Sequence, residues 1–196
     1  MNQKIAKILL KKNKSKIVSL TAYSKSIAKI IDNYCDIVLV GDSMANVLYG
    51  LKNTNEITLD NIIQHTKSVK KGIKKSLLVA DMPRGSYTNL KKAEKNAKLI
   101  LKSTGCDAVK MENNKKNYKI IHGLCKKNIP VMGHIGFTPQ FKKKFKIEGD
   151  TKEKANKLLR EALLIEKAGA FAIVLECISP KASKIITAKL KIPTIG

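Results

Sequence analysis

The chain has 196 residues, of which 43% are hydrophobic and 28% are charged, and its formal net charge is +24 at pH 7. This length and balance suit one soluble globular domain with a substantial buried core. No apolar run approaches the ~20 residues of a membrane-spanning helix, and the lysine-punctuated N-terminus lacks the apolar block of a signal peptide. We therefore expect a cytoplasmic protein with no membrane partner.

The positive charge alone would suggest binding to nucleic acid. However, only Arg84 and Arg160 among the 39 basic residues are arginines, and aromatic residues make up 5% of the chain. Proteins that read phosphates and bases usually use the planar fork of arginine. We predict a solvated, lysine-rich surface and no specific nucleic-acid partner, with weak binding at low salt from charge alone. A nucleic-acid-associated protein is therefore kept as an alternative hypothesis, which only the charge supports.

The cysteines show no CxxC spacing and lie beside apolar runs, at Cys35, Cys106, Cys125 and Cys177. We predict buried free thiols rather than a zinc site or a disulfide framework.

Hydrophobic periodicity divides the chain into alternating elements. A short amphipathic helix is expected within residues 1–15. In chain order there follow a strand at 17–22, a helix at 24–34, a strand at 36–41, a loop at 52–56, a helix at 59–71, a strand at 76–81, a helix at 89–103, a strand at 108–112, a helix at 118–127, a strand at 130–135, a loop at 136–150, a helix at 151–167, a strand at 171–176, a helix at 181–190 and a strand at 192–196.

Alternation of apolar strands with helices predicts a parallel α/β sheet. Polar side chains recur at the carboxyl ends of successive strands, at Asp42, Asp81, Glu112, His134 and Glu176. This recurrence favours a (β/α)8 barrel over an open sheet, whose site is confined to one switch point. A closed barrel needs an eighth strand after the seven predicted. Either the chain is a fragment that lacks the last βα units or the barrel is completed in another way. We favour a fragment forming one barrel domain over 1–196, truncated after strand seven.

The carboxylates at three successive strand ends offer only oxygen ligands, which magnesium prefers. Magnesium held by Asp42, Asp81 and Glu112 would chelate a 2-oxo acid and stabilise the enolate formed when a neighbouring proton is removed. Lys110 shares a strand face with Glu112 and is a candidate partner for the substrate carboxylate. Glu176 is the candidate general base.

Each of these residues also has a structural alternative. Asp42 and Ser43 are typical of a helix cap, and Lys110 and Glu112 of a salt bridge. His134 is typical of a hydrogen-bonded residue at the strand end, and Glu176 of a solvated carboxylate. Four acidic residues occur together at matching strand ends, and this favours a functional role for the set over the structural alternatives.

Five segments resemble ketopantoate hydroxymethyltransferases and occur in the order of that family. They are VGDSMANVLYG at 40–50, VADMP at 79–83, VKME at 109–112, PVMGHIGFTPQ at 130–140 and AGA with VLEC within 168–177. The resemblance extends from about residue 17 to residue 196.

The resemblance implies a TIM barrel of the phosphoenolpyruvate mutase and isocitrate lyase type. It implies transfer of a hydroxymethyl group from methylenetetrahydrofolate to 3-methyl-2-oxobutanoate, giving ketopantoate for pantothenate and coenzyme A biosynthesis, in a homo-oligomer that is often a decamer. By motif match Glu176 is the base, Asp42, Asp81 and Glu112 hold Mg²⁺, and the oxo acid is bound by Asp42, Ser43, Asp81 and Lys110. We place His134 with the substrate-binding residues.

Several positions depart from the family pattern. Ser24 stands where an aspartate is usual, Arg84 where an apolar residue is usual, and Asn113 and Asn114 where two glycines are usual. The loop 141–149 is shorter than usual and rich in lysine. These departures support a second hypothesis, another Mg-dependent, enolate-forming lyase or aldolase of the same barrel superfamily that acts on a different 2-oxo acid.

Overall fold

The computed structural model describes residues 2–114 and 117–196. The chain divides into two compact units, residues 1–110 and residues 111–196. The strands are hydrogen-bonded in the order of the sequence, as expected for successive βα units: β1 (Ser19–Thr21), β2 (Ile37–Val40), β3 (Leu77–Asp81), β4 (Ala108–Glu112), β5 (Val131–Gly136), β6 (Ala172–Glu176) and β7 (Thr194–Ile195). The prediction of a single domain stays a prediction.

The helices lie where periodicity predicted them: α1 (Gln3–Leu10), α2 (Lys25–Ile31), α4 (Leu59–Lys70), α5 (Leu90–Thr104), α6 (Tyr118–Lys126), α7 (Lys152–Lys167) and α8 (Pro180–Lys189). Two short elements were not predicted, α3 (Met44–Val47) and the 3₁₀ helix η1 (Thr54–Glu56). Each of them is about one turn long, which is too short for a helical period to be visible in the sequence.

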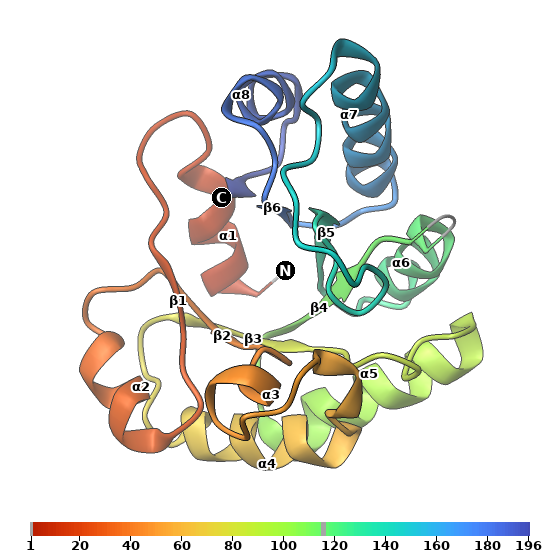
Figure 1. Cartoon of the computed structure of the whole chain (residues 1–196). Helices are drawn as coiled ribbons and strands as arrows, with labels where there is room; N and C mark the ends of the chain where they lie inside the picture. The colour runs from red at the N-terminus through yellow and green to blue at the C-terminus, as the bar shows by residue number, and fades with distance from the viewer. Residues whose placement is uncertain (1, 115–116) are drawn as a thin grey trace. The chain divides into compact units, whose positions relative to one another are not determined.

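In the first unit, β2 and β3 are parallel and pair from Ile37–Leu77 to Val40–Ala80. Helices α4 and α5 lie side by side on one face of these strands, and α1 lies on the opposite face (Figure 1). Cover on both faces explains why the strands are almost continuously apolar. A Thr58–Asn61 capping box starts α4, and Gly105, with φ of 69°, ends α5.

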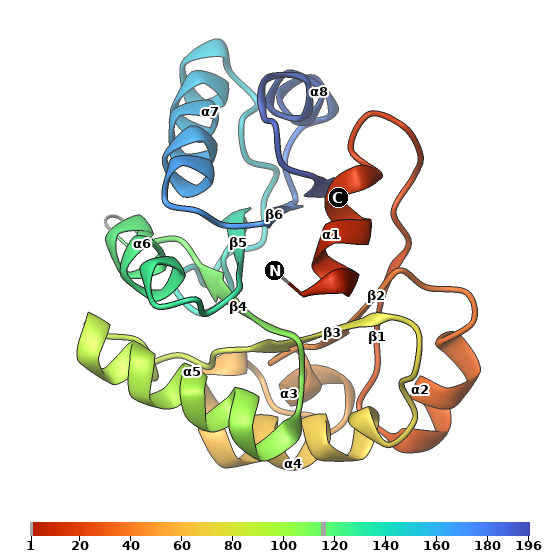
Figure 2. The same ribbon diagram turned by 180° about the vertical axis from the view of Figure 1, so that it is seen from behind.

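In the second unit, β6 pairs in parallel with both β5 and β7. Helices α7 and α8 pack against each other, as Figure 2 shows. At Gly133 a Cβ atom would lie 2.5 Å from Cγ2 of Ile165, so glycine is needed for α7 to pack closely on β5. Thr151 caps the start of α7 by accepting the backbone N–H of Lys154.

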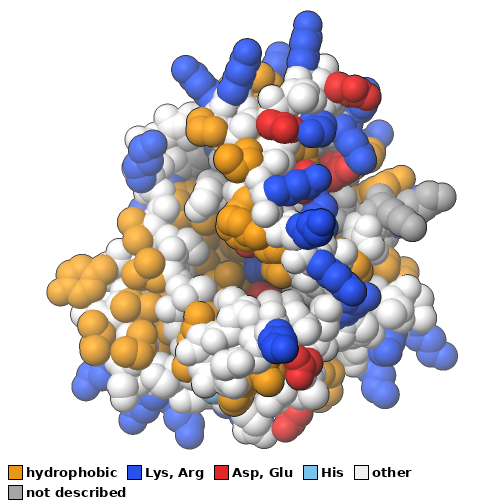
Figure 3. Space-filling view, viewed as in Figure 1, with side chains coloured by type: hydrophobic (Ala, Val, Ile, Leu, Met, Phe, Trp, Pro, Cys, Tyr) orange, Lys and Arg blue, Asp and Glu red, His pale blue; other side chains and the backbone are white. Residues whose placement is uncertain are grey.

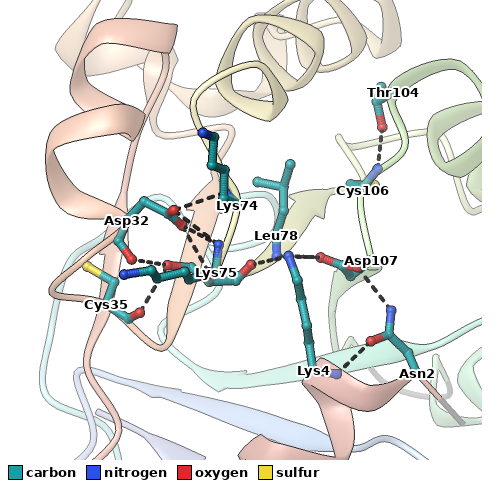
Figure 4. A network of polar contacts seen from close by, with 11 residues as sticks. Asn2, Lys4, Asp32, Cys35, Lys74, Lys75, Leu78, Thr104, Cys106 and Asp107 are labelled. Atoms are coloured by element: carbon teal, nitrogen blue, oxygen red, sulfur yellow. Dashed lines mark hydrogen bonds and ion pairs between the residues drawn. The ribbon is translucent and has the colours of Figure 1, made fainter.

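A buried aspartate joins the end of α2 to the loop before β3 (Figure 4). The Asp32 carboxylate accepts hydrogen bonds from the backbone N–H groups of Lys74, Lys75 and Ser76, at 2.9–3.1 Å. Burial acts to raise the pKa of Asp32, but these backbone donors outweigh burial and hold its pKa below the ordinary value of 3.8. The carboxylate is therefore more stable in the folded chain than in the unfolded chain.

A second aspartate ties α1 to the sheet. Asp107 accepts the backbone N–H of Leu78 at 2.9 Å and the side-chain amide of Asn2 at 2.9 Å. Lys4 of α1 lies 3.6 Å from the same carboxylate and donates to the Ser76 carbonyl at 2.7 Å (Figure 4). The leading helix is therefore fixed by polar contacts as well as by the buried Ile5 and Ile8.

The lysine and arginine side chains project from many parts of the visible face and do not gather in one patch (Figure 3). Within residues 2–114 and 117–196, no helix is both long enough and apolar enough to cross a membrane. The cysteines are free thiols. Cys106 is buried, whereas Cys35, Cys125 and Cys177 are half-buried, so the prediction of buried thiols is confirmed for Cys106 alone. Burial raises the pKa of the Cys106 and Cys125 thiols to about 11.

We predict that Asp32→Asn lowers the free energy of unfolding by roughly 2–4 kcal/mol at pH 7, because an amide cannot accept all of these backbone donors. The folded-state pKa is lowered, so the stabilisation is complete above the unfolded pKa and is lost as the pH falls through the folded pKa. The difference between parent and variant in urea unfolding should therefore shrink below about pH 4.

The matched control is Asp60→Asn on the exposed surface of α4, which should change the free energy of unfolding by about 0.5 kcal/mol or less. An Asp32 variant as stable as this control, or a difference unchanged at pH 3, would contradict the assignment.

Candidate functional site

Three of the predicted residues meet in the first unit because of strand register. Asp81 ends β3 and lies opposite Lys110 of β4, and Asp42 follows β2. The Lys110 ammonium is 2.7 Å from Oδ1 of Asp81, and the backbone N–H of Asp42 donates to Oδ2 of Asp81 at 3.0 Å. The ion pair with Asp81 is thus a contact of Lys110 that the sequence did not indicate, and the salt bridge between Lys110 and Glu112 stays a prediction.

This cluster is buried and unequal in charge. Asp42, Asp81 and Lys110 are 4%, 3% and 5% exposed, so two carboxylates accompany one ammonium group away from water. Buried carboxylates in excess favour a cation nearby, and oxygen donors suit a hard divalent ion such as Mg²⁺. Among the residues that the structure describes, no three His, Cys, Asp or Glu side chains form a group able to hold a metal. The ligand set of Asp42, Asp81 and Glu112 therefore stays a prediction.

The Ser43 hydroxyl borders the same cluster. A Cβ atom at Gly41 would lie 2.9 Å from Oγ of Ser43 and 3.4 Å from Oδ2 of Asp81, so a side chain at this position would crowd both groups. Ser43 stands at the N-cap of α3, but its side chain makes no cap hydrogen bond. Its Oγ is instead 2.8 Å from the hydroxyl of Tyr23. The helix-cap alternative is therefore wrong for Ser43.

The second unit brings together the remaining three predicted residues. His134 of β5 is buried between two carboxylates. Its Nε2 is 3.1 Å from Oε2 of Glu176, and its Nδ1 is 3.9 Å from Oε1 of Glu112. Glu112 is buried and accepts the backbone N–H of Gln140 at 3.1 Å, whereas the Glu176 side chain is 37% exposed. Glu176 is thus the member of this trio that solvent or a ligand can reach.

A glycine allows the chain to turn beside Glu176. Gly136, with φ of 94°, lies opposite Glu176 in the β5–β6 pair. A Cβ atom at Gly136 would be 2.1 Å from the carbonyl oxygen of Glu176, which accepts the backbone N–H of Phe137 at 2.8 Å. This position requires glycine both for its backbone conformation and for this close approach.

The lysine-rich loop after β5 is tied back to the second unit. Lys142 donates to the Gly136 carbonyl at 2.8 Å and to Glu148 at 2.7 Å. The Glu148 backbone N–H bonds to the Cys177 carbonyl at 2.7 Å, next to Glu176. These contacts hold the loop beside the candidate base even though the loop departs from the family pattern.

Among the other departures, Ser24 has a structural role. Ser24 caps α2 by accepting the Ile27 backbone N–H at 3.5 Å, a role that aspartate also performs. Asn113 is buried, and its backbone N–H donates to the His134 carbonyl at 2.8 Å. Arg84 is exposed in the turn after β3.

Sequence reasoning missed the aromatic residues that support Ser43. Tyr23, His65 and Tyr49 are linked by hydrogen bonds and by edge-to-face ring contacts. Tyr23 follows the carboxyl end of β1, so the strand-end rule that found Asp42 could also have found Tyr23. His65 lies within α4, and nothing in the local pattern sets it apart from a core or surface histidine.

Comparison with known proteins gives a consistent set of relatives. A family model described as ketopantoate hydroxymethyltransferase matches residues 3–196. The 3-methyl-2-oxobutanoate hydroxymethyltransferase of Pelagibacter ubique is 53% identical over 196 residues, which cover 100% of this chain and 76% of the relative. The protein of the same name from Clostridium botulinum is 50% identical over 191 residues, which cover 94% of this chain and 70% of the relative.

Solved structures share the fold at low sequence identity. A phosphoenolpyruvate phosphomutase from Streptomyces platensis subsp. rosaceus aligns with a TM-score of 0.71 at 14% identity, over 98% of this chain and 71% of that one. A 2,3-dimethylmalate lyase of the PEP mutase/isocitrate lyase superfamily aligns with a TM-score of 0.68 at 12% identity, over 98% and 75%. These likenesses confirm the predicted fold class, a (β/α)8 barrel type of which the described residues form seven strands.

We predict that Gly136→Ala destabilises the chain by roughly 3 kcal/mol or more, because the added methyl group would overlap the Glu176 carbonyl in a strained backbone conformation. Gly85 is a matched control, since its φ is 81° and a Cβ atom added there would meet no other atom within 4 Å. Gly85→Ala should cost about 1 kcal/mol, from backbone strain alone. Equal losses for the two variants in urea unfolding would contradict the close approach at Gly136.

Proposed function

The chain belongs to the ketopantoate hydroxymethyltransferase family, and we propose that it transfers a hydroxymethyl group from methylenetetrahydrofolate to 3-methyl-2-oxobutanoate. The curated relatives are named for transfer to this oxo acid. The observation that carries the proposal for this chain is the buried cluster of two carboxylates, which follow β2 and end β3, and one ammonium group from β4. Such a cluster suits an anionic, metal-chelating substrate.

Asp42 and Asp81 would hold Mg²⁺, with Glu112 as the further ligand that the family motif implies. The buried excess of carboxylate over ammonium and the oxygen-only donor set support this assignment. When bound, Mg²⁺ would act as a Lewis acid that stabilises negative charge on the keto oxygen of the substrate.

Lys110 and Ser43 would bind the carboxylate of the oxo acid. The Lys110 ammonium has three donors, and its ion pair with Asp81 holds it at the cluster. The Ser43 hydroxyl lies near the same Asp81, since a Cβ atom at Gly41 would contact both side chains. Charge-assisted hydrogen bonds to a carboxylate are about twice as strong as neutral ones, so these two donors would fix the orientation of the substrate.

Glu176 would act as the general base that removes the C3 proton of 3-methyl-2-oxobutanoate. Its partial exposure lets a substrate reach it, and Nε2 of His134 lies 3.1 Å from its Oε2. Water would add to the methylene carbon of the folate, giving formaldehyde and tetrahydrofolate, whose two nitrogens take the protons of the water. The electron pair of the broken C–H bond would then form the new C–C bond to the formaldehyde carbon, and the proton taken by Glu176 would pass to the new hydroxyl oxygen.

A second candidate function is enolate formation from a different 2-oxo acid by a lyase or aldolase of the same superfamily. The observations that favour it are Arg84 in the exposed turn after β3 and the lysine-rich loop held beside Glu176. Turnover of a more highly charged oxo acid without folate would support this candidate. The homo-oligomer and the absence of a specific nucleic-acid partner stay predictions.

We predict that Glu176→Gln slows the exchange of the C3 proton of 3-methyl-2-oxobutanoate at least ~100-fold, because the amide cannot accept the proton. Mg²⁺-dependent binding of the oxo acid should remain near the parent value. Proton NMR in D₂O measures the exchange. The control is Glu153→Gln on the exposed first turn of α7. Exchange at the parent rate in the Glu176 variant would exclude Glu176 as the base.

We also predict that Asp81→Asn weakens binding of Mn²⁺, a spectroscopic substitute for Mg²⁺, by tenfold or more, because a buried anionic ligand is lost. Electron paramagnetic resonance titration of the free ion measures this binding without turnover. Asp60→Asn should bind Mn²⁺ like the parent. Unchanged affinity in the Asp81 variant would remove Asp81 from the ligand set.

A further inference from the structure

The Ser43 hydroxyl is oriented by a tyrosine and not by its helix. Cap serines and threonines of this chain, such as Ser24, Thr58 and Ser179, have extended backbone ψ angles and accept a backbone N–H. Ser43 has φ of −56° and ψ of −11°, a helical conformation, and makes no such bond. Its hydroxyl lies 2.8 Å from the Tyr23 hydroxyl, so this hydrogen bond sets the direction of Oγ.

Tyr23 is itself held by a histidine. Nδ1 of His65 is 2.7 Å from the backbone carbonyl oxygen of Tyr23. A carbonyl oxygen only accepts, so Nδ1 carries the proton. In the neutral ring Nε2 is then an acceptor, and the Tyr49 hydroxyl at 2.7 Å donates to it. Both tyrosine rings meet the imidazole edge to face, with centroids 6.5 Å and 5.8 Å away.

These contacts fix both ends of one segment. Ser43 begins the segment 43–49 and Tyr49 ends it, and each end is joined to His65, directly or through Tyr23. Val47 and Leu48, between the two ends, are exposed. Burial therefore does not hold Val47 and Leu48 in place, and the polar contacts with Tyr23 and His65 restrain the segment instead.

We propose that Tyr23 is a positioning residue that acts through Ser43 and sets the affinity for the 2-oxo acid. The inference rests on the proposed function, in which Ser43 binds the substrate carboxylate. A carboxylate only accepts, so the Ser43 hydroxyl must donate to it, and the Tyr23 hydroxyl must then donate to Ser43. The chain of donors runs from Tyr23 to Ser43 to the substrate, and each hydrogen bond polarises the next.

The test uses Tyr23→Phe, which removes one oxygen atom and keeps the ring that meets His65. The dissociation constant for 3-methyl-2-oxobutanoate in the presence of Mg²⁺, measured by calorimetry, should rise about tenfold. The KM for C3 proton exchange should rise in parallel, with kcat changing less than threefold. The control is Tyr34→Phe, at a tyrosine that is 75% exposed, which should match the parent.

A double-mutant cycle separates positioning from a general structural effect. In the Ser43→Ala background, Tyr23→Phe should not weaken binding further, because its hydroxyl acts through the missing Oγ. Unchanged binding in Tyr23→Phe alone, or an equal loss in both backgrounds, would overturn the inference.

Binding of the oxo acid to the parent chain distinguishes failure of the inference from failure of the proposed function. If the parent does not bind the oxo acid at all, the proposed function fails. If the parent binds it and Tyr23→Phe binds equally well, only the inference fails.

Discussion

The first unit depends on one buried carboxylate, that of Asp81. One of its oxygen atoms pairs with the Lys110 ammonium and the other accepts the backbone N–H of Asp42. The carboxylate therefore links residues of three neighbouring parallel strands or their ends, and it does so away from water. Loss of either partner would leave a buried charge poorly compensated, which is among the most costly changes that a folded protein can undergo. Because the register of β3 and β4 brings Asp81 opposite Lys110, the chemistry of this cluster is a direct consequence of strand pairing.

The three polar residues of the second unit differ in how exposed their side chains are. Glu112 and His134 are buried and held by backbone contacts, whereas Glu176 reaches solvent. A base must be accessible to a substrate, and Glu176 meets this condition, with the buried imidazole of His134 3.1 Å from its carboxylate. The glycine at 136 is part of the same arrangement, since any side chain there would collide with the Glu176 carbonyl. The loop contact through Glu148 and Cys177 adds a further restraint next to Glu176.

Much of this arrangement could be predicted from the sequence, because parallel α/β proteins place polar residues at the carboxyl ends of apolar strands. That rule found Asp42, Asp81, Glu112, His134 and Glu176, and alternation along β4 linked Lys110 to them. The rule could not show that Lys110 pairs with Asp81, because that contact depends on the register between two strands. Nor could it show that Ser43 turns away from its helix toward Tyr23, since a serine before a short helix is typical of a cap. His65 was missed because its partners lie 16 and 42 residues away in the sequence.

The central claim is that these residues form an enolising site for a 2-oxo acid. The most direct measurement follows loss of the C3 deuterium from deuterated 3-methyl-2-oxobutanoate in water by proton NMR, with the parent chain and without any folate. We expect exchange that requires Mg²⁺ and stops when the ion is removed by a chelator. A folded sample that gives no exchange, or the same rate with and without the ion, would contradict this claim.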